Sequence, residues 1–472
     1  MTPVLITLLP SAALLAVLWR VTGDPVRSAV SVTAMLVPML TFGYQVDVLG
    51  RAVSLSDVDA LNWPLLGVNG AVFGLITVLV WRTRRSLSAA AEALAMIAVV
   101  FIALSLPGIA NSFRVAASAS GHEAASESTG EASPPSGSEE VAMPDIYYLV
   151  LDGYGRADVL DEVFGYNNQP FLNSLEDRGF YVAPKSLSNY SNTQLSIASS
   201  LNMHYLDDLP TNLSPRAARL LTALLEAPEV VLRLHRLGYK YVNFNTIWWG
   251  TDNAPLADVT YGEDVLSEFE VVFLRTTAPG RLLPQPTWQK EHLRTLSHLP
   301  DVARMPEPTF AFAHILFPHP PFVFAANGRQ LRRDDTLGAS WDDQEGYIEQ
   351  MRFLNTWVLG TIDSVLNASD ETPIFILQGD HGPFSTKGTG DTALIHWERM
   401  SILNALLVPP VVRAQLYPSI TPVNTFRLVL RGLFAEALRR LPDRSMYSPA
   451  VLEARIDVTE EVKTRQPAGA SP

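Results

Sequence analysis

The sequence predicts an α/β domain with a largely parallel sheet, preceded by an all-α membrane bundle of four transmembrane helices. Two observations lead to this fold class. Apolar residues gather in four long runs at the start of the chain, whereas short apolar runs alternate with longer helical patterns in the remainder. Strands that alternate with helices favour a mainly parallel sheet that is covered on both faces.

The composition limits the possible classes of function. A chain of 472 residues is too long for one compact core, and its apolar fraction of 47 % is high for a wholly soluble protein. The net charge of −13 argues against a nucleic-acid partner. The chain contains no cysteine, which excludes disulfides, cysteine metal sites and cysteine nucleophiles.

Each of the four amino-terminal apolar runs has about the length that crosses a hydrocarbon core of roughly 30 Å. The first run lacks a basic amino-terminal region and three more runs follow it, so we interpret it as a retained helix and not as a signal peptide. The four predicted spans are Pro3–Trp19, Ser28–Tyr44, Trp63–Trp81 and Ala93–Phe113.

Arginines in the connecting loops predict the orientation of these spans. The first loop carries Arg20 and Arg27, and the third carries Arg82, Arg84 and Arg85. By the positive-inside rule these two loops are cytoplasmic. We therefore expect a multi-pass protein of the plasma (inner) membrane, with the lipid bilayer as its partner and an extracytoplasmic carboxy-terminal domain.

Changes in composition divide the chain into four expected parts. Residues 1–115 form the transmembrane region. Residues 116–142 are rich in Ser, Gly and Glu, contain almost no large apolar side chain and are expected to form a flexible linker. Residues 143–455 are expected to form the extracytoplasmic domain, and the polar residues 456–472 are expected to be a disordered tail.

The expected elements of the domain follow from apolar periodicity. Buried strands are predicted at Ile146–Leu151, Tyr239–Phe244, Thr309–Leu316, Pro373–Leu377 and Ile402–Val408. Helices are predicted between them at Pro170–Arg178, Pro215–Leu237, Tyr347–Leu366 and Thr425–Arg440.

Two of these strands end in residues that suit a metal ion. The first runs into Asp152, and Pro373–Leu377 runs into Asp380 and His381 within a Gly-Asp-His-Gly sequence. Ligand sites in open α/β sheets form at the carboxyl ends of strands, so these groups are expected to lie close together. Carboxylates and imidazoles together suit a divalent metal such as zinc or manganese.

A third strand end adds two histidines, His314 and His319. Taken singly, these signals have simpler explanations. An Asp-Gly pair after a strand is usually a turn, and a buried histidine is usually a hydrogen-bonded core residue. The combination of all three strand ends is what favours a site.

A hydroxyl-rich segment, Ser188–Asn202, leads into a helix expected to begin at about Thr193. A hydroxyl at the amino terminus of a helix lies in a positive field, which favours an alkoxide and a bound anion. Contact with a metal would lower its pKa further. The alternative is that Thr193 only caps the helix.

The order of these motifs resembles the alkaline phosphatase superfamily, and its sulfatase-like branch in particular. The resemblance covers about Met143 to Ser448. It is similar to the membrane-bound enzymes that transfer phosphoethanolamine or phosphoglycerol to envelope polymers. The resemblance implies an alkaline-phosphatase-like sheet sandwiched by helices, a divalent metal ion (Zn, Mn, Mg or Ca) and a lipid-linked or envelope-polymer substrate.

The resemblance also assigns roles to individual residues. It implies a metal held by Asp152, Thr193, Asp380 and His381. Thr193 matches the nucleophile, and His314 and His319 match histidines that touch the transferred anion or the leaving group. Lys387, His396 and Arg399 are further positive groups whose place in the site stays open, and Trp341 either stacks on the substrate or packs in its loop.

Three departures from the sulfatase pattern favour phospho-group chemistry. Gly153 stands where sulfatases often have a second aspartate, Ile197 replaces the arginine that follows their nucleophile, and no cysteine is available to become formylglycine. We therefore expect a membrane-anchored, metal-dependent hydrolase or transferase that moves a phospho-group through a threonine-linked intermediate. The alternatives are a sulfuric ester hydrolase and a catalytically inactive sulfatase-like membrane module in envelope assembly.

Overall fold

The structure, a computed structural model, describes residues 2–52, 58–84, 86–89, 91–92, 96, 143–212, 214–246, 248, 250–251, 253–262, 276–282, 288–331 and 340–465. The chain forms two compact units. One consists of Met1–Glu140 with Phe269–Gln285, and the other of Val141–Glu268 with Pro286–Pro472. Each unit is described separately.

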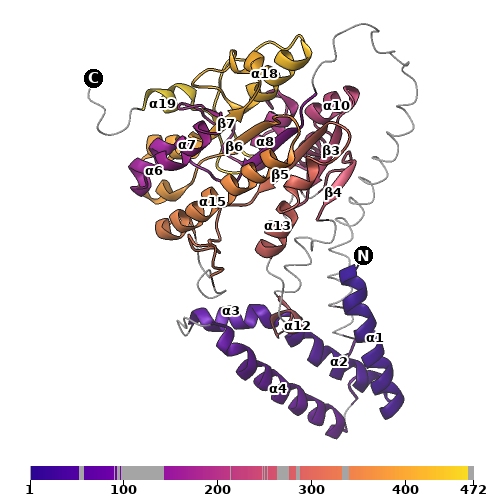
Figure 1. The fold of residues 1–472 in the computed structure, drawn as a ribbon. Coiled ribbons are helices and arrows are strands. Elements are labelled where there is room, and N and C mark those ends of the chain that lie inside the picture. Colours follow the sequence, from indigo (N-terminus) through magenta and orange to yellow (C-terminus); the bar gives the residue numbers. More distant parts are fainter. Residues whose placement is uncertain are drawn as a thin grey trace. The chain divides into compact units, whose positions relative to one another are not determined.

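The first unit is helical (Figure 1). In its described part, one helix, α4, is long and apolar enough to cross a membrane, and α2 with α3 would make a second if this bent pair is one span. The predicted fourth span, Ala93–Phe113, lies outside the described residues apart from Met96. The unit's elements are α1 (Thr2–Thr22), α2 (Pro25–Leu40), α3 (Phe42–Ala52), η1 (Val58–Leu61), α4 (Asn62–Arg82) and α12 (Ala278–Leu282).

The predicted second span, Ser28–Tyr44, is not one straight helix. Helix α2 ends at Leu40, and α3 begins at Phe42 after a bend of 50°. Pro38 inside α2 has no backbone N–H to donate, so the helix is weakened just before the bend. The side chain of Gln45 donates to the Pro38 carbonyl at 3.1 Å and so satisfies an acceptor near the break.

The first and third loops lie at the same end of this helical unit. Arg27 Nη2 donates to the carbonyl of Thr83 at 3.0 Å, and helix α2 packs against both α1 and α4. The predicted orientation needs both basic loops at one end of the helices, and this packing is compatible with that prediction.

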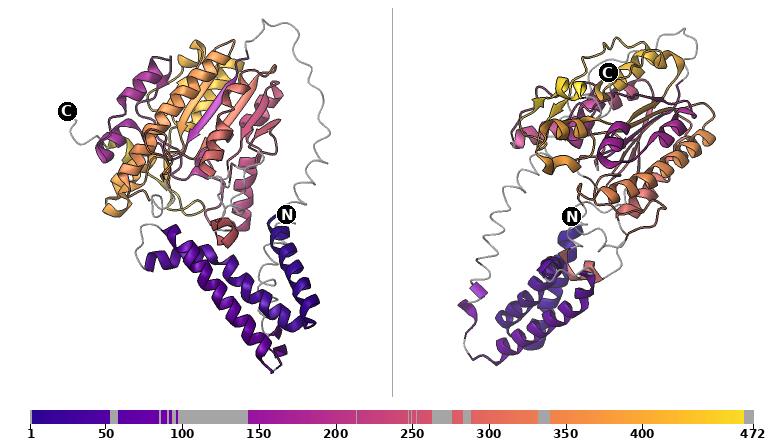
Figure 2. Two further views of the ribbon diagram at one scale, coloured as in Figure 1. Left: turned by 60° about the horizontal axis from the view of Figure 1, so that its bottom comes forward. Right: turned by 90° about the vertical axis from the view of Figure 1, so that its left-hand side faces the viewer.

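The second unit is built around a seven-stranded mixed sheet with the order β2-β7-β6-β1-β5-β3-β4 (Figures 1 and 2). Strands β6, β1, β5, β3 and β4 are parallel, whereas β7 runs antiparallel to both β6 and β2. The strands are β1 (Ile146–Leu151), β2 (Tyr181–Val182), β3 (Lys240–Phe244), β4 (Val259–Tyr261), β5 (Thr309–Ile315), β6 (Ile374–Gly379) and β7 (Asn404–Leu407).

Helices cover both faces of this sheet, as Figure 2 shows. This arrangement fits the alkaline-phosphatase-like fold expected from the sequence. The helical elements are α6 (Ala157–Phe164), α7 (Gln169–Glu176), α8 (Thr193–Asn202), α9 (Pro215–Glu226), α10 (Glu229–Arg236), α13 (Trp288–Leu296), α14 (Leu299–Val302), α15 (Gln344–Ala368), η3 (Ser385–Thr389), α16 (Thr392–Met400), α17 (Pro410–Arg413), α18 (Pro422–Phe434) and α19 (Thr459–Thr464).

All five predicted strands are confirmed, but two predicted helices needed correction. The predicted helix Pro215–Leu237 is two helices, because Pro228 cannot continue α9 and instead precedes the first turn of α10. The predicted helix Thr425–Arg440 begins earlier and ends at Phe434, where Ala435 adopts a left-handed conformation with φ of 53°.

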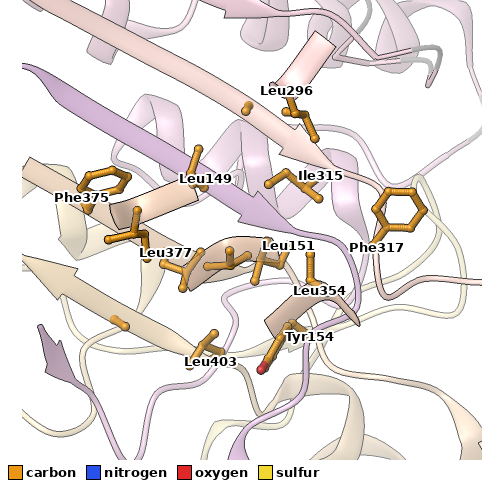
Figure 3. Close-up of a cluster of buried hydrophobic side chains, with 14 of the residues drawn as sticks. Leu149, Leu151, Tyr154, Leu296, Ile315, Phe317, Leu354, Phe375, Leu377 and Leu403 are labelled. Carbon is orange, nitrogen blue, oxygen red and sulfur yellow. The ribbon is translucent and has the colours of Figure 1, made fainter. Parts of the chain in front are cut away.

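Side chains of the central strand β1 alternate between two apolar layers. Its odd-numbered residues, such as Leu149 and Leu151, pack with α7, α14 and α15 on one face. Figure 3 shows part of this layer, where Leu149, Leu151 and Leu377 lie with Leu354 of α15. Its even-numbered residues, such as Tyr148, pack with α8, α10 and α18 on the other face. Burial on both faces fixes the register of β1, so the position of its carboxyl end is fixed too.

The expected disordered tail begins too early. Residues Ile456–Asp457 form strand β9, which pairs with β8 (Met446–Tyr447), and α19 follows it. Val458 and Val462 are four residues apart, so both face the same side and are buried against Trp397. This apolar pair orders a segment whose overall composition is polar.

Candidate active site

The two carboxylates predicted from the sequence leave the same edge of the sheet. Strand β1 lies between β6 and β5, and Leu151 is in register with Gly379 and with Ile315. Asp152 and Asp380 therefore follow adjacent parallel strands at the same level. Both side chains are almost completely buried.

Helix α8 brings Thr193 to the same place. Thr193 is the first residue of this helix, all ten residues of which are buried. Its Oγ1 lies 3.0 Å from Nε2 of His381. Two serine hydroxyls attach this segment to the end of β6, because Ser196 Oγ donates to the Asp380 carbonyl at 2.7 Å and Ser188 Oγ donates to the same oxygen. Thr193 is thus fixed next to the residues that follow the sheet.

The tautomer of His381 follows from its second hydrogen bond. Its Nδ1 lies 3.0 Å from the carbonyl oxygen of Gly382, which can only accept. Nδ1 therefore carries the hydrogen, and Nε2 presents a lone pair. That lone pair lies 3.2 Å from Oδ2 of Asp380 and 3.6 Å from Oδ1 of Asp152.

The residues present fit a divalent cation. Oδ1 of Asp152 and Oδ2 of Asp380 are buried and have no hydrogen-bond partner among the described residues. Together with His381 they offer ligand atoms that all lie within 4.8 Å of one another. Buried lone pairs that face each other without a hydrogen are costly, and a cation between them removes that cost. Oxygen and imidazole ligands suit zinc or manganese.

The pKa values of the two carboxylates shift in opposite directions. Burial and the neighbouring Asp152 raise the pKa of Asp380 to about 7. Burial also acts to raise the pKa of Asp152, but its histidine neighbours, His319 foremost, outweigh this effect and lower it. Burial, followed by the positive charge of Arg399, holds the pKa of His381 well below its ordinary value. His381 is therefore neutral, as a metal ligand has to be.

His314 lies behind Asp152 and is completely buried. Its Nε2 is 3.5 Å from Oδ2 of Asp152, and its Nδ1 is 3.0 Å from the hydroxyl of Thr251. Trp248 packs edge-on against the ring at 5.2 Å. These contacts suit a residue that holds Asp152 in place better than one that touches the transferred group.

His319 occupies the more open side of the site. It is only partly buried, and its ring centroid lies 6.5 Å from that of His381. Its Nδ1 lies 2.7 Å from the carbonyl of Pro320, so it donates there, and Nε2 makes no hydrogen bond within the described residues. Trp341 stands edge-on to the ring at 5.0 Å.

The structure explains why glycine stands after Asp152. Gly153 has φ of 75°, a left-handed conformation that favours glycine, and a Cβ at this position would collide with the ring of Trp341. The second aspartate that sulfatases often carry has no room here. Trp341 therefore packs against the site itself.

The three positive groups left open by the sequence lie in different places. The imidazole of His396 lies 3.3 Å from Glu461 and packs at a tilt against the ring of Tyr447. Exposed Lys387 lies over the ring of Phe384. Arg399 contacts the backbone of the site, because its Nη1 donates to the carbonyl of Gly382 at 3.0 Å.

One further supporting residue, Glu398, was not predicted from the sequence, where no pattern pointed to it. This carboxylate is completely buried and accepts four hydrogen bonds, from the backbone N–H groups and the hydroxyls of Ser385 and Thr386. A Cβ on Gly382 would collide with the Glu398 carbonyl, so helix α16 packs directly on the turn that follows His381. Glu398 thus fixes this turn.

We expect Glu398→Gln to destabilise the protein. A side-chain amide has one acceptor oxygen, so donors from Ser385 or Thr386 would lose their partner, at about 1–3 kcal/mol for each unsatisfied donor. Ser385→Ala is the matched comparison, because it removes one hydroxyl and keeps the carboxylate. Thermal melting should show a larger loss for Glu398→Gln than for Ser385→Ala. Equal melting temperatures for Glu398→Gln and the wild type would contradict this role.

No family model matches the chain, and no curated protein sequence matches it. Solved structures to which it is similar include phosphoethanolamine transferase domains and sulfatases, the two classes that the sequence resembles. The zinc complex of the carboxy-terminal periplasmic domain of EptC from Escherichia coli matches with 13 % identity and a TM-score of 0.46, over 70 % of this chain and 98 % of that one.

Two further solved structures represent the same two classes. The soluble domain of lipooligosaccharide phosphoethanolamine transferase A from Neisseria meningitidis has 12 % identity and a TM-score of 0.40, over 63 % of this chain and 89 % of that one. A putative sulfatase from Bacteroides thetaiotaomicron has 13 % identity and a TM-score of 0.40, over 65 % and 78 %. Similarities this weak do not assign a function, which has to come from the site itself.

Proposed function

We propose that this protein is a membrane-anchored, metal-dependent enzyme that moves a phospho-group from a phosphodiester through a covalent intermediate on Thr193. One observation carries the proposal. The Thr193 hydroxyl, at the amino terminus of a buried helix, lies 3.0 Å from a histidine nitrogen on which two unpartnered carboxylate oxygens converge. A hydroxyl fixed beside buried groups of this kind is the arrangement of an activated nucleophile.

The chain's own residues supply the nucleophile and its orientation. Oγ1 of Thr193, after losing its hydroxyl proton to solvent, forms a bond to phosphorus as an alkoxide while the bond from phosphorus to the leaving alcohol oxygen breaks; Thr193 is released as the alkoxide in the second step. The amino-terminal field of α8 favours negative charge on Oγ1 and on the phosphoryl oxygens. A water molecule or an acceptor hydroxyl then attacks the phosphorus and releases Thr193, which makes the enzyme a hydrolase or a transferase.

A divalent cation would be held by Asp152, Asp380, His381 and the Thr193 oxygen, where it would supply Lewis-acid chemistry and neutralise negative charge. The neutral tautomer of His381 and the buried, unpartnered oxygens of both aspartates prepare this set of ligands. His314 supports Asp152 from behind.

His319 is the candidate for protonating the leaving group. Its Nδ1–H is committed to the Pro320 carbonyl, so a proton on the second nitrogen, Nε2, is the one available for donation. Its partial exposure and its position beside His381 support this role. The alcohol leaves with this proton, and the following nucleophile returns one to the histidine.

The absence of cysteine favours phospho-group over sulfate chemistry. Thr193 in the nucleophile position cannot become formylglycine, and the chain has no cysteine from which to form it. The apolar helices of the first unit suit a lipid-linked donor or an envelope-polymer acceptor, with the catalytic unit outside the cytoplasm.

A donor screen of the full-length chain tests the proposal. Phospholipids with alcohol head groups, nucleotide phosphodiesters and aryl sulfates are offered to the wild type and to Thr193→Ala in parallel. We expect metal-dependent turnover of at least one phosphodiester, lost in the variant, and no sulfate release. Sulfate release that depends on Thr193 would support a sulfatase, and absence of both activities and of metal binding would support an inactive module.

A further inference from the structure

The guanidinium of Arg399 is held against the backbone on both sides of the site. Its Nε donates to the carbonyl of Ser191 at 2.8 Å, two residues before Thr193, and its Nη1 donates to the carbonyl of Gly382 at 3.0 Å. The Gly382 carbonyl also accepts from His381. Arg399 is therefore attached to the segments that carry the nucleophile and the histidine.

Two aromatic rings fix the plane of the same guanidinium. It lies 5.2 Å from the ring centroid of Phe384 and 6.0 Å from that of Trp341. Trp341 in turn covers Gly153 and stands edge-on to His319. The cation thus contacts the same tryptophan that packs beside the metal-ligand set, and its orientation is set before any substrate arrives.

Arg399 forms no direct ion pair with a described residue, and the opposite charges that act on it from a greater distance are led by Asp380 and Asp152. Several other arginines of this unit pair directly with a carboxylate, as Arg178 does with Asp363 at 2.7 Å. The two backbone bonds of Arg399 use only Nε and Nη1. Among the described residues Nη2 has no hydrogen-bond partner. A preorganised cation with a free donor beside a site is suited to an anionic ligand.

We propose that Arg399 binds an anionic oxygen of the phosphodiester that Thr193 attacks. The proposal rests on the function proposed above and adds a residue that selects for a charged phospho-group. Nη2 donates to a phosphoryl oxygen while Nε and Nη1 stay on the backbone. Neutral esters lack the charge that this donor recognises, so the site selects anionic esters.

Binding of inorganic phosphate tests this role without relying on turnover. Equilibrium dialysis with labelled phosphate is carried out on the full-length chain supplied with Mn²⁺, for the wild type, Arg399→Gln and Arg399→Lys. Arg413→Gln is the matched control, because Arg413 also donates to one carbonyl, that of Gly179, and lies over one ring, that of Tyr181, at the β2–β7 edge of the sheet. Mn²⁺ binding and thermal melting are measured for each variant.

We expect Arg399→Gln to weaken phosphate binding by about 10- to 100-fold, because a charge-assisted hydrogen bond is lost, with Mn²⁺ affinity close to that of the control. Arg399→Lys keeps the charge and should lie between Arg399→Gln and the wild type. If Arg399→Gln unfolds at too low a temperature for phosphate binding to be measured, the phosphate affinity of Arg399→Lys is compared with that of Arg413→Gln instead. Phosphate affinities equal to that of the control in the measurable Arg399 variants would overturn the subsite.

The two proposals fail in different ways. If turnover depends on Thr193 but phosphate affinity does not change in the Arg399 variants, the anion subsite is refuted and the proposed function stands. Phosphate binding that depends on Arg399 in a protein without any Thr193-dependent turnover supports the anion subsite and removes the proposed reaction.

Discussion

Replacing Thr193 with alanine should lower phosphodiester turnover by about 10⁴-fold or more, because removal of a covalent nucleophile disables the whole reacting unit. The variant should remain folded. Thr193 is the first residue of α8, its neighbour Asn192 caps the helix without a side-chain bond, and the Thr193 hydroxyl contacts His381. Loss of activity with unchanged melting would identify a chemical role.

Thr193→Ser is the matched control for this experiment. Serine keeps the hydroxyl and the position at the helix start and removes only a methyl group. It should retain a large part of the turnover and still form the covalent intermediate. Substantial turnover by Thr193→Ala would contradict the nucleophile assignment and would favour direct attack by water.

Replacing Asp380 with asparagine should weaken the binding of a divalent metal by more than about 100-fold. Loss of a group that merely orients a ligand costs roughly 10- to 100-fold, and Asp380 is expected to ligate directly. The folded protein should survive, since the amide oxygen can still accept from the backbone N–H groups of Gly153 and His381. The new NH₂ group would stand where the unpartnered Oδ2 now faces His381.

The comparison carboxylate is Asp363, which lies in a partly exposed ion pair with Arg178. Asp363→Asn makes the same chemical change away from the candidate site. Titration of Zn²⁺ or Mn²⁺ into the full-length chain should show near wild-type affinity for Asp363→Asn and a large loss for Asp380→Asn. Equal affinities in both variants would show that the metal, if bound, is held elsewhere.

Local patterns were sufficient to predict the centre of the fold. The strand Ile146–Leu151 is confirmed residue for residue, because six consecutive apolar residues are buried on both faces of the sheet. The approach of Asp152 to Asp380 was also predictable, because parallel strands end at one edge. By contrast, the antiparallel pairing of β7 with β6 has no periodic signature, since a buried strand reads the same in either direction.

The supporting residues were harder to predict because their roles depend on distant contacts. Glu398 and Arg399 are charged residues on a helix, where the default expectation is a solvent-exposed face. Only the fold brings α16 against the turn after His381 and the segment before Thr193. Ser188 is one of many hydroxyl residues in its segment, and nothing in the sequence distinguishes it from the others. Its hydrogen bond to the Asp380 carbonyl joins residues that are 192 positions apart.

In the helical unit, hydropathy predicted the apolar segments but not how they bend or pair. Hydropathy identified apolar runs correctly, as in Asn62–Arg82, but hydropathy does not register a bend such as the one that follows Pro38. A windowed hydropathy average also does not predict the hydrogen bond that Asn69 donates to Gln45 at 3.0 Å within this unit. The number of spans and the orientation of the unit remain predictions.

The most direct test of the central claim is to trap the reaction on Thr193. The full-length protein is mixed with a turned-over phosphodiester, quenched in acid within the first turnovers and digested, and the peptides are analysed by mass spectrometry. We predict that the added phospho-group is found on Thr193, in a metal-dependent manner, and is absent from Thr193→Ala. A phospho-group on another residue, or rapid turnover in which Thr193 is never modified, would contradict the proposed mechanism.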